Sequence, residues 1–442
     1  MDNHNGIDEL LREWIAQQSE KAQSMSEMEQ SIREWLYRVG NLLLTLWLLC
    51  LSPRYDEPAV ACPHCTGQAK YQGRREGILR TMLGQIKYKR AYYLCAECGQ
   101  GHYPLDDQYG LRPNTMSAEM ERLAALVGVQ MPFAQASLLF SELTLTSLSD
   151  QSIDKATQSY GQSVEKVEAN LYQQAVEQKP QEPSVRPLRL YGSLDGGRVQ
   201  TRAPQGQPQP WRELKIGAWF QARGESPKKP EGEWAIQAYD ISYFSDILPA
   251  EQFGNLLWAT GVERGAEQAL ELIFLGDGAR WIWDLVDLHF PHAIQIVDWF
   301  HACEYLAPVA KSAFKDSHQQ EAWIHEVRDK LWQGKLDEVI DACQEHVRPH
   351  LKAEVDPAQQ ALTYFTNNQH RMDYPSYRKN GYQIGSGTIE SAVKQIASQR
   401  LKVSGARWNV QSARLVAKAR ATFLSGQWDR IASQRRFVQK CA

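Results

Sequence analysis

Residues 188–197 read Leu-Arg-Leu-Tyr-Gly-Ser-Leu-Asp-Gly-Gly, a run of β-forming residues that ends in an acid and two glycines. Such a run, bounded by turn residues, predicts a buried strand with the carboxylate of Asp195 at its end. Residues 272–278, Leu-Ile-Phe-Leu-Gly-Asp-Gly, repeat the arrangement at Asp277. An Asp-Gly pair at a strand end is by itself usually only a turn. Two carboxylates at the ends of neighbouring strands, however, can converge on a pair of metal ions.

A third acidic residue stands near the start of a later helix. Residues 385–394 read Gly-Ser-Gly-Thr-Ile-Glu-Ser-Ala-Val-Lys, which combines a glycine-rich beginning, a Ser or Thr cap and a helical run. This pattern predicts that Glu390 lies in an early turn of a helix. With Asp195 and Asp277 it could complete a site of hard oxygen ligands. Asp298 is an alternative to Asp277 as the second acid of this site, because it also follows an apolar run, residues 294–297.

The segments around these acids predict an α/β domain with a mixed sheet. Further strands are expected at 214–220, 234–243 and 293–297, and a helix at 253–269. Strands interrupted by a helix in this way indicate an α/β arrangement. From about residue 303 to 378 the pattern is almost wholly helical, which indicates a helical insertion within the domain. A polar stretch with three prolines, residues 177–187, is typical of a linker and precedes the domain.

Composition and periodicity divide the whole chain into six segments. Apolar residues at helical spacing predict two helices before residue 51, and helices return between 117 and 176. Cysteine pairs, glycines and alternating β-formers predict a small β-rich module between them. The expected segments are a helical N-terminal region, 1–60; a zinc-binding β-rich module, 61–105; a helical DNA-binding or linker region, 106–180; the first part of the α/β core, 185–302; the helical insertion, 303–380; and the completion of the core with the Glu-bearing helix and a basic tail, 381–442.

Four cysteines form two Cys-x-x-Cys pairs, Cys62 with Cys65 and Cys95 with Cys98. Each pair is spaced so that both sulfurs can reach one ion, and tetrahedral Zn²⁺ is the expected occupant of four thiolates. The spacing between the pairs suits a zinc ribbon with an extended hairpin, so we predict a structural zinc site. His64 and His102 are alternative ligands. The alternative is that these cysteines are redox-active or simply buried. It is disfavoured because two independent Cys-x-x-Cys pairs would then have to occur in one short module without binding a common ion.

Basic residues concentrate in two segments of a chain whose formal net charge is only −3. Local basic patches contact DNA phosphates, whereas a solvated charged face is the ordinary alternative. In the cysteine module, where tyrosines are interleaved, we expect DNA contact from Arg74, Arg75, Lys87, Lys89 and Arg90. After Glu390 we expect DNA contact from Lys394, Arg400, Lys402, Arg407, Arg414 and Lys418.

Five short motifs follow one another along the chain: Leu194-Asp-Gly-Gly, Trp211-Arg-Glu-Leu-Lys-Ile-Gly, Leu275-Gly-Asp-Gly-Ala, Ile296-Val-Asp-Trp-Phe-His-Ala and Gly385-Ser-Gly-Thr-Ile-Glu-Ser. Together and in this order they resemble the motifs of DDE transposases of bacterial insertion sequences, specifically the Kra group, which is distantly similar to Mutator-like elements. The resemblance extends from about residue 61 to residue 427 and includes the cysteine module. The first 60 residues carry none of these motifs.

The resemblance implies an RNase H-like catalytic core that holds two Mg²⁺ ions and cuts and joins double-stranded DNA. Asp195 and Asp277 would lie on strands and Glu390 on the helix after the insertion, with Asp195 bridging both ions. His301 would contact the scissile phosphate or cap its helix, and Lys215 would lie on the second strand near the site. The DNA partners would be the terminal inverted repeats of the element and its target, and a homo-oligomer would hold two DNA ends together.

Composition disfavours several other classes of protein. Eight cysteines in 442 residues are too few for a disulfide scaffold, and the start of the chain does not resemble a secretory signal. The apolar run at 42–51 is half as long as the about 20 residues that cross a bilayer. We therefore expect a cytoplasmic, nucleoid-associated protein with no membrane partner. The alternatives are a DNA-binding regulator with inert carboxylates, and an RNase H-like nuclease without strand transfer.

Overall fold

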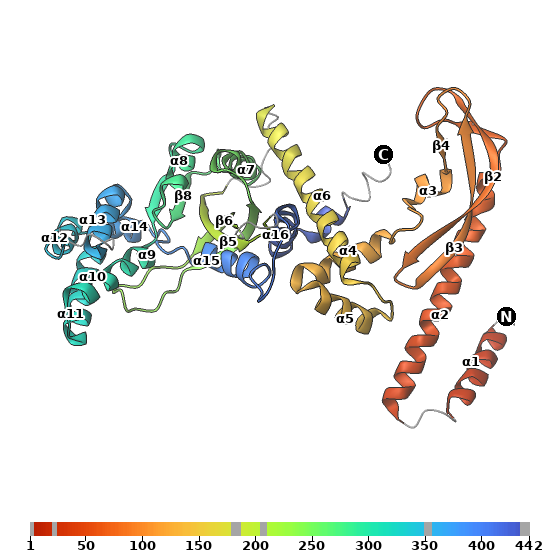
Figure 1. Ribbon diagram of the computed structural model, residues 1–442, viewed down its shortest axis with the longest axis horizontal. Coiled ribbons are helices and arrows are strands. Elements are labelled where there is room, and N and C mark those ends of the chain that lie inside the picture. The colour runs from red at the N-terminus through yellow and green to blue at the C-terminus, as the bar shows by residue number, and fades with distance from the viewer. Residues whose placement is uncertain (1–3, 20–23, 178–186, 204–209, 349–355, 434–442) are drawn as a thin grey trace. The chain divides into compact units, whose positions relative to one another are not determined.

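A computed structural model describes residues 4–19, 24–177, 187–203, 210–348 and 356–433 (Figure 1). The chain divides into two compact units, Met1–Thr157 with Arg430–Ala442, and Gln158–Asp429. The helix α6 (Asp150–Val176) begins in the first unit and continues into the second. Each unit is built around its own sheet. No described helix is long and apolar enough to cross a membrane.

The first unit opens with the two helices that the apolar spacing predicts, α1 (His4–Ser19) and α2 (Met25–Leu51). A capping box starts α2, because the side chains of Ser24 and Glu27 each accept a hydrogen bond from the backbone of the other. Leu48 and Leu51 of α2 belong to the same buried cluster as Leu79. The helix therefore backs a β-hairpin and is part of the core of this unit.

The first sheet contains four antiparallel strands in the order β1-β2-β3-β4. The strands are β1 (Ala59–Ala61), β2 (Gln68–Thr81), β3 (Gly84–Cys95) and β4 (Gly101–His102). Three further helices follow: α3 (Pro104–Tyr109), α4 (Ala118–Gln130) and α5 (Phe133–Thr144). The long hairpin of β2 and β3 agrees with the alternating β-formers of the cysteine module.

The second sheet is mixed and has the order β7-β6-β5-β8-β9. Its strands are β5 (Arg189–Gln200), β6 (Trp211–Arg223), β7 (Gln237–Asp246), β8 (Glu271–Gly276) and β9 (Ile294–Val297). Strands β5, β6 and β7 are antiparallel, and β8 and β9 run parallel to β5. The strand predicted from residue 234 begins at Gln237 instead. Trp234 packs against Phe300, with ring centroids 4.8 Å apart, and so lies outside the sheet.

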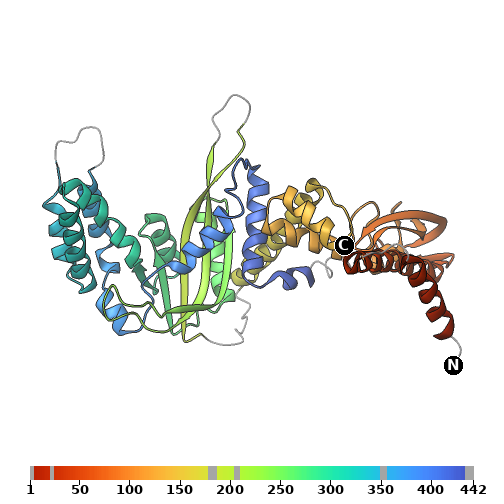
Figure 2. The same ribbon diagram turned by 90° about the horizontal axis from the view of Figure 1, so that it is seen from below.

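Helices cover both faces of this sheet. On one face lie α7 (Ala250–Glu263) and α8 (Arg280–His289), and the indole of Trp219 on β6 donates to Thr260 of α7 at 3.0 Å. On the other face lie α15 (Gly387–Val393) and a π-helical turn (Lys394–Ser398). The helix α16 (Val410–Leu424) packs along the edge strand β7, where the Tyr243 N–H donates to Ser425 at 2.7 Å. In Figure 2, α15 crosses in front of the strands. Covering both faces explains why the central strands read as nearly continuous apolar runs.

The predicted helical insertion lies between β9 and α15. It comprises α9 (Trp299–Glu304), α10 (Leu306–Ala313), α11 (Ser317–Trp332), α12 (Leu336–Gln344), α13 (Pro357–Asn368) and α14 (Tyr374–Lys379). Tyr374 donates to the carbonyl of Val297 at 3.2 Å, and Arg371 donates to Gln295 at 2.6 Å. These two hydrogen bonds attach the end of the insertion to β9.

Candidate active site

The first two predicted acids lie beside each other at one edge of the sheet. In the parallel pair of β5 and β8, Ser193 is the partner of Leu275, and its hydroxyl donates to the Leu275 carbonyl at 2.8 Å. Asp195 and Asp277 each follow that pair by two residues. Because alternate residues of a strand share a face, both carboxylates lie on the side of the sheet to which Ser193 points. Both acids are partly exposed.

The third predicted acid comes to the same edge from α15. A Cβ atom added at Gly197 would lie 2.9 Å from Ala397 and 3.5 Å from Val393, so this helix and the π-helical turn approach β5 closely. Glu390 precedes Val393 by three residues and therefore shares its helical face. It lies in the first turn of α15, where the Ser386 hydroxyl donates to its carboxylate at 2.9 Å.

Like charges surround Asp195. The pKa of this carboxyl is raised to about 6, first by burial and then by the negative charges of Asp277 and Glu390. The Gly196 N–H, which donates to the carboxylate at 2.6 Å, and His301 lower the pKa. A cluster of carboxylates that has lost part of its water favours a bound cation. The donor set therefore fits a hard divalent ion.

The spacing of the three acids does not suit a single ion. In the described residues, the carboxylate oxygens of the three acids do not all lie within 4.8 Å of one another. Two ions about 4 Å apart can be shared by acids that do not all reach the same ion. The arrangement is thus compatible with a two-ion site.

Asp298, the alternative to Asp277 as the second acid, is fully buried and has different contacts. Its carboxylate accepts hydrogen bonds from the backbone N–H groups of His301 and Ser386. Its own N–H donates to the Gly276 carbonyl at 2.8 Å. Asp298 is therefore the N-cap of α9 and joins that helix to the segment before α15. Asp277 is more accessible, and only one hydrogen bond to its carboxylate, from the Ala279 N–H at 2.8 Å, is formed among the described residues.

The two hydrogen bonds to Asp298 predict the effect of Asp298→Asn. Hydrogen bonds to charged groups contribute about 1.5–3 kcal/mol, and an amide can replace only part of this. We expect the variant to lose about 1–3 kcal/mol of unfolding free energy in urea. The matched control is Asp316→Asn at the exposed N-cap of α11, where Asn caps as well as Asp. An Asp298→Asn protein with native stability and no activity would instead indicate a metal ligand.

His301 lies near the acids, and Lys215 lies on the other face of the sheet. His301 is partly exposed, its Nδ1 lies 3.4 Å from Glu304, and it acts on the pKa of Asp195. Lys215 is the strand partner of Gly196, so its side chain leaves the face opposite Asp195. It is buried, pairs with Glu213 at 2.5 Å and lies 5.3 Å from the ring centroid of Trp281. The expectation that Lys215 belongs to the site is therefore corrected.

The four predicted zinc ligands converge in the first unit. All four sulfurs lie within 4.8 Å of one another, and the pairs Cys62 with Cys98 and Cys65 with Cys95 are each 3.6 Å apart. Tetrahedral zinc with Zn–S bonds of about 2.3 Å requires sulfurs roughly 3.8 Å apart. A backbone N–H from Cys98 is the first of several that lower the pKa of Cys95 to about 7. This cysteine cluster could therefore hold zinc, and neither His64 nor His102 belongs to it.

Removing a cysteine of this cluster should release zinc and unfold the module. Structural zinc contributes on the order of 10 kcal/mol of apparent binding free energy, which a small hairpin module cannot replace. We expect the wild-type protein to retain zinc through gel filtration and Cys95→Ser to lose it, as measured by atomic absorption. Cys50→Ser is the control, because Cys50 is exposed and outside the cluster. Zinc retained at the wild-type level by Cys95→Ser would show that the cluster does not bind it.

The basic residues of the cysteine module differ in accessibility. Arg90 is buried, pairs with Asp106 and stacks 3.7 Å from the ring centroid of Tyr103. It cannot contact a phosphate without breaking this pair, so the expectation of DNA contact is corrected for Arg90. Arg74 pairs with Asp56 at 2.5 Å. Arg74 is nevertheless exposed, as are Arg75, which lies over the ring of Tyr92, Lys87 and Lys89.

The basic residues after Glu390 are divided in the same way. Lys394, Lys402 and Arg407 are exposed, whereas Arg400 is buried and lies 5.2 Å from the ring centroid of Trp408. Three further basic residues of the tail, Arg435, Arg436 and Lys440, lie outside the described residues.

A buried ion network holds Arg414 and Lys418. Lys418 is 1% exposed and pairs with Glu168 of α6 and, at 2.7 Å, with Asp246 at the end of β7. Arg414 pairs with Asp246 and with Glu165 of α6. The expectation of DNA contact is therefore corrected for Arg400, Arg414 and Lys418. No local pattern pointed to this network, because its partners are 168 to 250 positions apart in the sequence.

Comparisons with known proteins give little further information. No protein-family model matches the chain, and no curated protein matches it. Among solved structures, the Drosophila P element transposase strand transfer complex aligns with 75% of this chain and 85% of that chain, with 9% sequence identity and a TM-score of 0.26. A similarity of this size determines neither the fold nor the function.

Proposed function

We propose that this chain is a DNA transposase of a bacterial insertion sequence, which cuts and joins DNA strands with metal ions held by Asp195, Asp277 and Glu390. One observation carries the proposal. Three acids, contributed by two parallel strands and by a helix that follows a helical insertion, meet at one edge of a mixed sheet. The sequence motifs around these acids are those that resemble DDE transposases.

The sheet supports an RNase H-like core. A central strand β5 has two antiparallel strands on one side and two parallel strands on the other, in the order β7-β6-β5-β8-β9. The insertion leaves the sheet directly after β9 and returns before the helix that carries Glu390. Within this core, Asp195 occupies the central strand, which suits the acid that would be shared by two ions.

The chain's own residues account for binding and orientation. Two Mg²⁺ ions, when bound, supply an activated oxygen nucleophile and neutralise the leaving oxygen of phosphodiester chemistry. Asp195, Asp277 and Glu390 would hold these ions. Asp298 positions the segment that carries Glu390, because it ties Ser386 to α9. His301, whose charge acts on the pKa of Asp195, would contact the scissile phosphate. No covalent bond between a serine or tyrosine and DNA is required.

Exposed basic residues provide the surfaces for DNA. On the hairpin these include Arg75, Lys87 and Lys89, and after Glu390 they include Lys394, Lys402 and Arg407. We propose that zinc in the cysteine cluster stiffens the hairpin and that the hairpin binds the element ends. Loss of one phosphate contact should weaken binding to all sequences to a similar extent and reduce its salt dependence.

The N-terminal helices support assembly on DNA. Ile32, Leu36, Leu43 and Trp47 of α2 are 47–68% exposed, although they are large and apolar. Leu48 and Leu51 of the same helix are buried instead, in the cluster that contacts the hairpin. Exposed apolar stripes of this kind usually mark interfaces. We propose that α2 contributes to the homo-oligomer that holds two DNA ends together.

The decisive experiment is Mg²⁺-dependent nicking and joining of a duplex that carries an end of the flanking element. We expect the purified protein to nick this duplex and to join the freed 3′-hydroxyl to target DNA. A protein that binds the duplex and never cuts it would be a DNA-binding regulator. A protein that cuts and never joins would be a structure-specific nuclease.

A further inference from the structure

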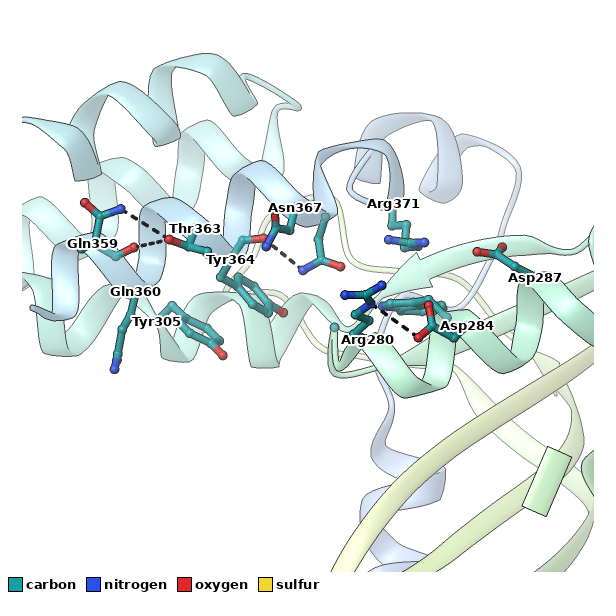
Figure 3. A pocket seen from close by; sticks show the side chains of 13 residues that line it. Arg280, Asp284, Asp287, Tyr305, Gln359, Gln360, Thr363, Tyr364, Asn367 and Arg371 are labelled. Carbon is teal, nitrogen blue, oxygen red and sulfur yellow. Dashed lines mark hydrogen bonds and ion pairs between the residues drawn. The ribbon is translucent and has the colours of Figure 1, made fainter. Parts of the chain in front are cut away.

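A cavity of about 770 Å³ opens beside Asp277, between α8 and α13 (Figure 3). Gly278, the residue after Asp277, lines it, and a Cβ atom added there would lie 2.6 Å from the ring of Tyr364. The Tyr364 hydroxyl donates to the Asp277 carbonyl at 2.9 Å. The wall of the cavity is thus attached directly to the loop that carries a proposed metal ligand. Its volume is in the range of small-molecule pockets.

One side of the cavity is rich in amide groups. Gln360, Thr363 and Asn367 are spaced by three and four residues on α13 and share one helical face, which Figure 3 shows lining the cavity. In the described part of the chain, the side-chain amides of Gln360 and Asn367 form no hydrogen bond. The indole N–H of Trp283, a residue that is only 3% exposed and lines the same cavity, also lacks a partner there. These donors and acceptors are available to a ligand.

The cavity also offers flat aromatic surface. The rings of Tyr305 and Tyr364 stack with centroids 3.9 Å apart and an interplanar angle of 15°, and both residues line the cavity. Amide groups hydrogen-bond the edges of nucleobases, and aromatic rings stack on their faces. The combination therefore suits a planar heterocycle with donors and acceptors at its edge.

The charges of the cavity favour a neutral group over a phosphate. Two arginines, Arg280 and Arg371, line it together with two acids, Asp284 and Asp287. Arg371 already donates to Gln295, and Arg280 lies 3.5 Å from Asp284. The formal charges of these four residues cancel, so a polyanion would gain little attraction here.

We propose that this cavity takes one unpaired base of the DNA strand under attack, close to the phosphate held at Asp277. The inference rests on the proposed function, because it needs DNA at the carboxylates. Enzymes that act on a DNA base bind that base extruded from the duplex, which costs the free energy of its pairing and stacking. A base that is already unpaired avoids that expense and should bind more tightly.

The test compares the binding of two fluorescent DNA probes in magnesium-free buffer without a chelator. One probe is a blunt duplex, and the other is the same duplex with a short single-stranded extension. We expect the wild-type protein to prefer the extended probe about tenfold, as stacking of one base would provide. Gln360→Ala with Asn367→Ala should reduce the preference to about twofold or less and leave blunt-duplex binding unchanged. The matched control, Gln319→Ala with Gln369→Ala, changes two exposed glutamines outside the cavity and should keep the preference.

Two outcomes would overturn the inference: a preference that the cavity variant retains, and a loss of binding that is equal for both probes. Mg²⁺-dependent nicking by the wild-type protein tests the proposed function separately. A preference that depends on the two amides in a protein that never nicks DNA would support the base cavity and refute the transposase. Nicking without any preference would refute the base cavity alone.

Discussion

Asp195→Asn should reduce Mg²⁺-dependent strand cleavage by about a thousandfold or more, because it removes the charge that two ions would share. Asp277→Asn and Glu390→Gln should have effects of the same order, since each removes a ligand to one ion. The variants should fold, because all three side chains lie where water reaches part of the site. Nicking rates on an element-end duplex measure the loss, and binding of that duplex without Mg²⁺ should stay near the wild-type level.

Asp298→Asn separates the two candidates for the second acid. The variant should be less stable and still cut DNA, because Asp298 uses its carboxylate to hold the backbone N–H groups of His301 and Ser386. Asp316→Asn, at the exposed N-cap of α11 in the insertion, should leave both stability and cleavage unchanged. The assignment of Asp277 would be wrong if Asp277→Asn cut DNA normally and a stable Asp298→Asn did not.

Lys418→Met should lower the free energy of unfolding by about 3–5 kcal/mol, the usual cost of leaving a buried charge without its partner. Lys418 lies between Glu168 and Asp246, and Asp246 is only 1% exposed. Burial raises the pKa of Glu168, and the ammonium group of Lys418 is the first of the charges that counteract this. Without the lysine, the two acids must protonate or draw water into the space between α6, α16 and β7.

Urea unfolding followed by far-UV circular dichroism measures this loss. Lys402→Met is the control, because Lys402 is exposed and a surface change of this kind usually alters stability by no more than about 0.5 kcal/mol. Combining Lys418→Met with Glu168→Leu should recover part of the lost stability, since it removes one of the unpaired acids. A Lys418→Met protein with native stability and weaker DNA binding would contradict the structural role and restore the DNA-contact hypothesis.

Local patterns in the sequence were sufficient to predict where the elements and the candidate ligands lie. The predicted strand end before Asp277 is confirmed, because β8 ends at Gly276. The predicted strand end at Asp195 is wrong, because β5 continues to Gln200 through its pairing with β6, a contact that the local run does not contain. The glycine-rich beginning of the helix that carries Glu390 and the two Cys-x-x-Cys pairs are likewise signals of a few residues. The predicted cap of that helix is wrong, because the Ser386 side chain makes no capping hydrogen bond and donates to Glu390 instead. Such signals persist in the fold because backbone periodicity, capping and ligand spacing are short-range effects.

The tertiary structure alone decided which charged residues are free to act. Arg90, Lys215 and Lys418 looked like accessible cations in the sequence and are buried in ion pairs. In the sequence, Asp298 follows an apolar run just as Asp277 does. In the structure it is the buried N-cap of α9, and it also accepts a hydrogen bond from the backbone of Ser386, 88 positions away. The cavity beside Asp277 combines α8 and α13, which the whole first half of the insertion separates. Burial and pairing depend on contacts between distant segments, and a local pattern contains no information about the partner that the fold will bring.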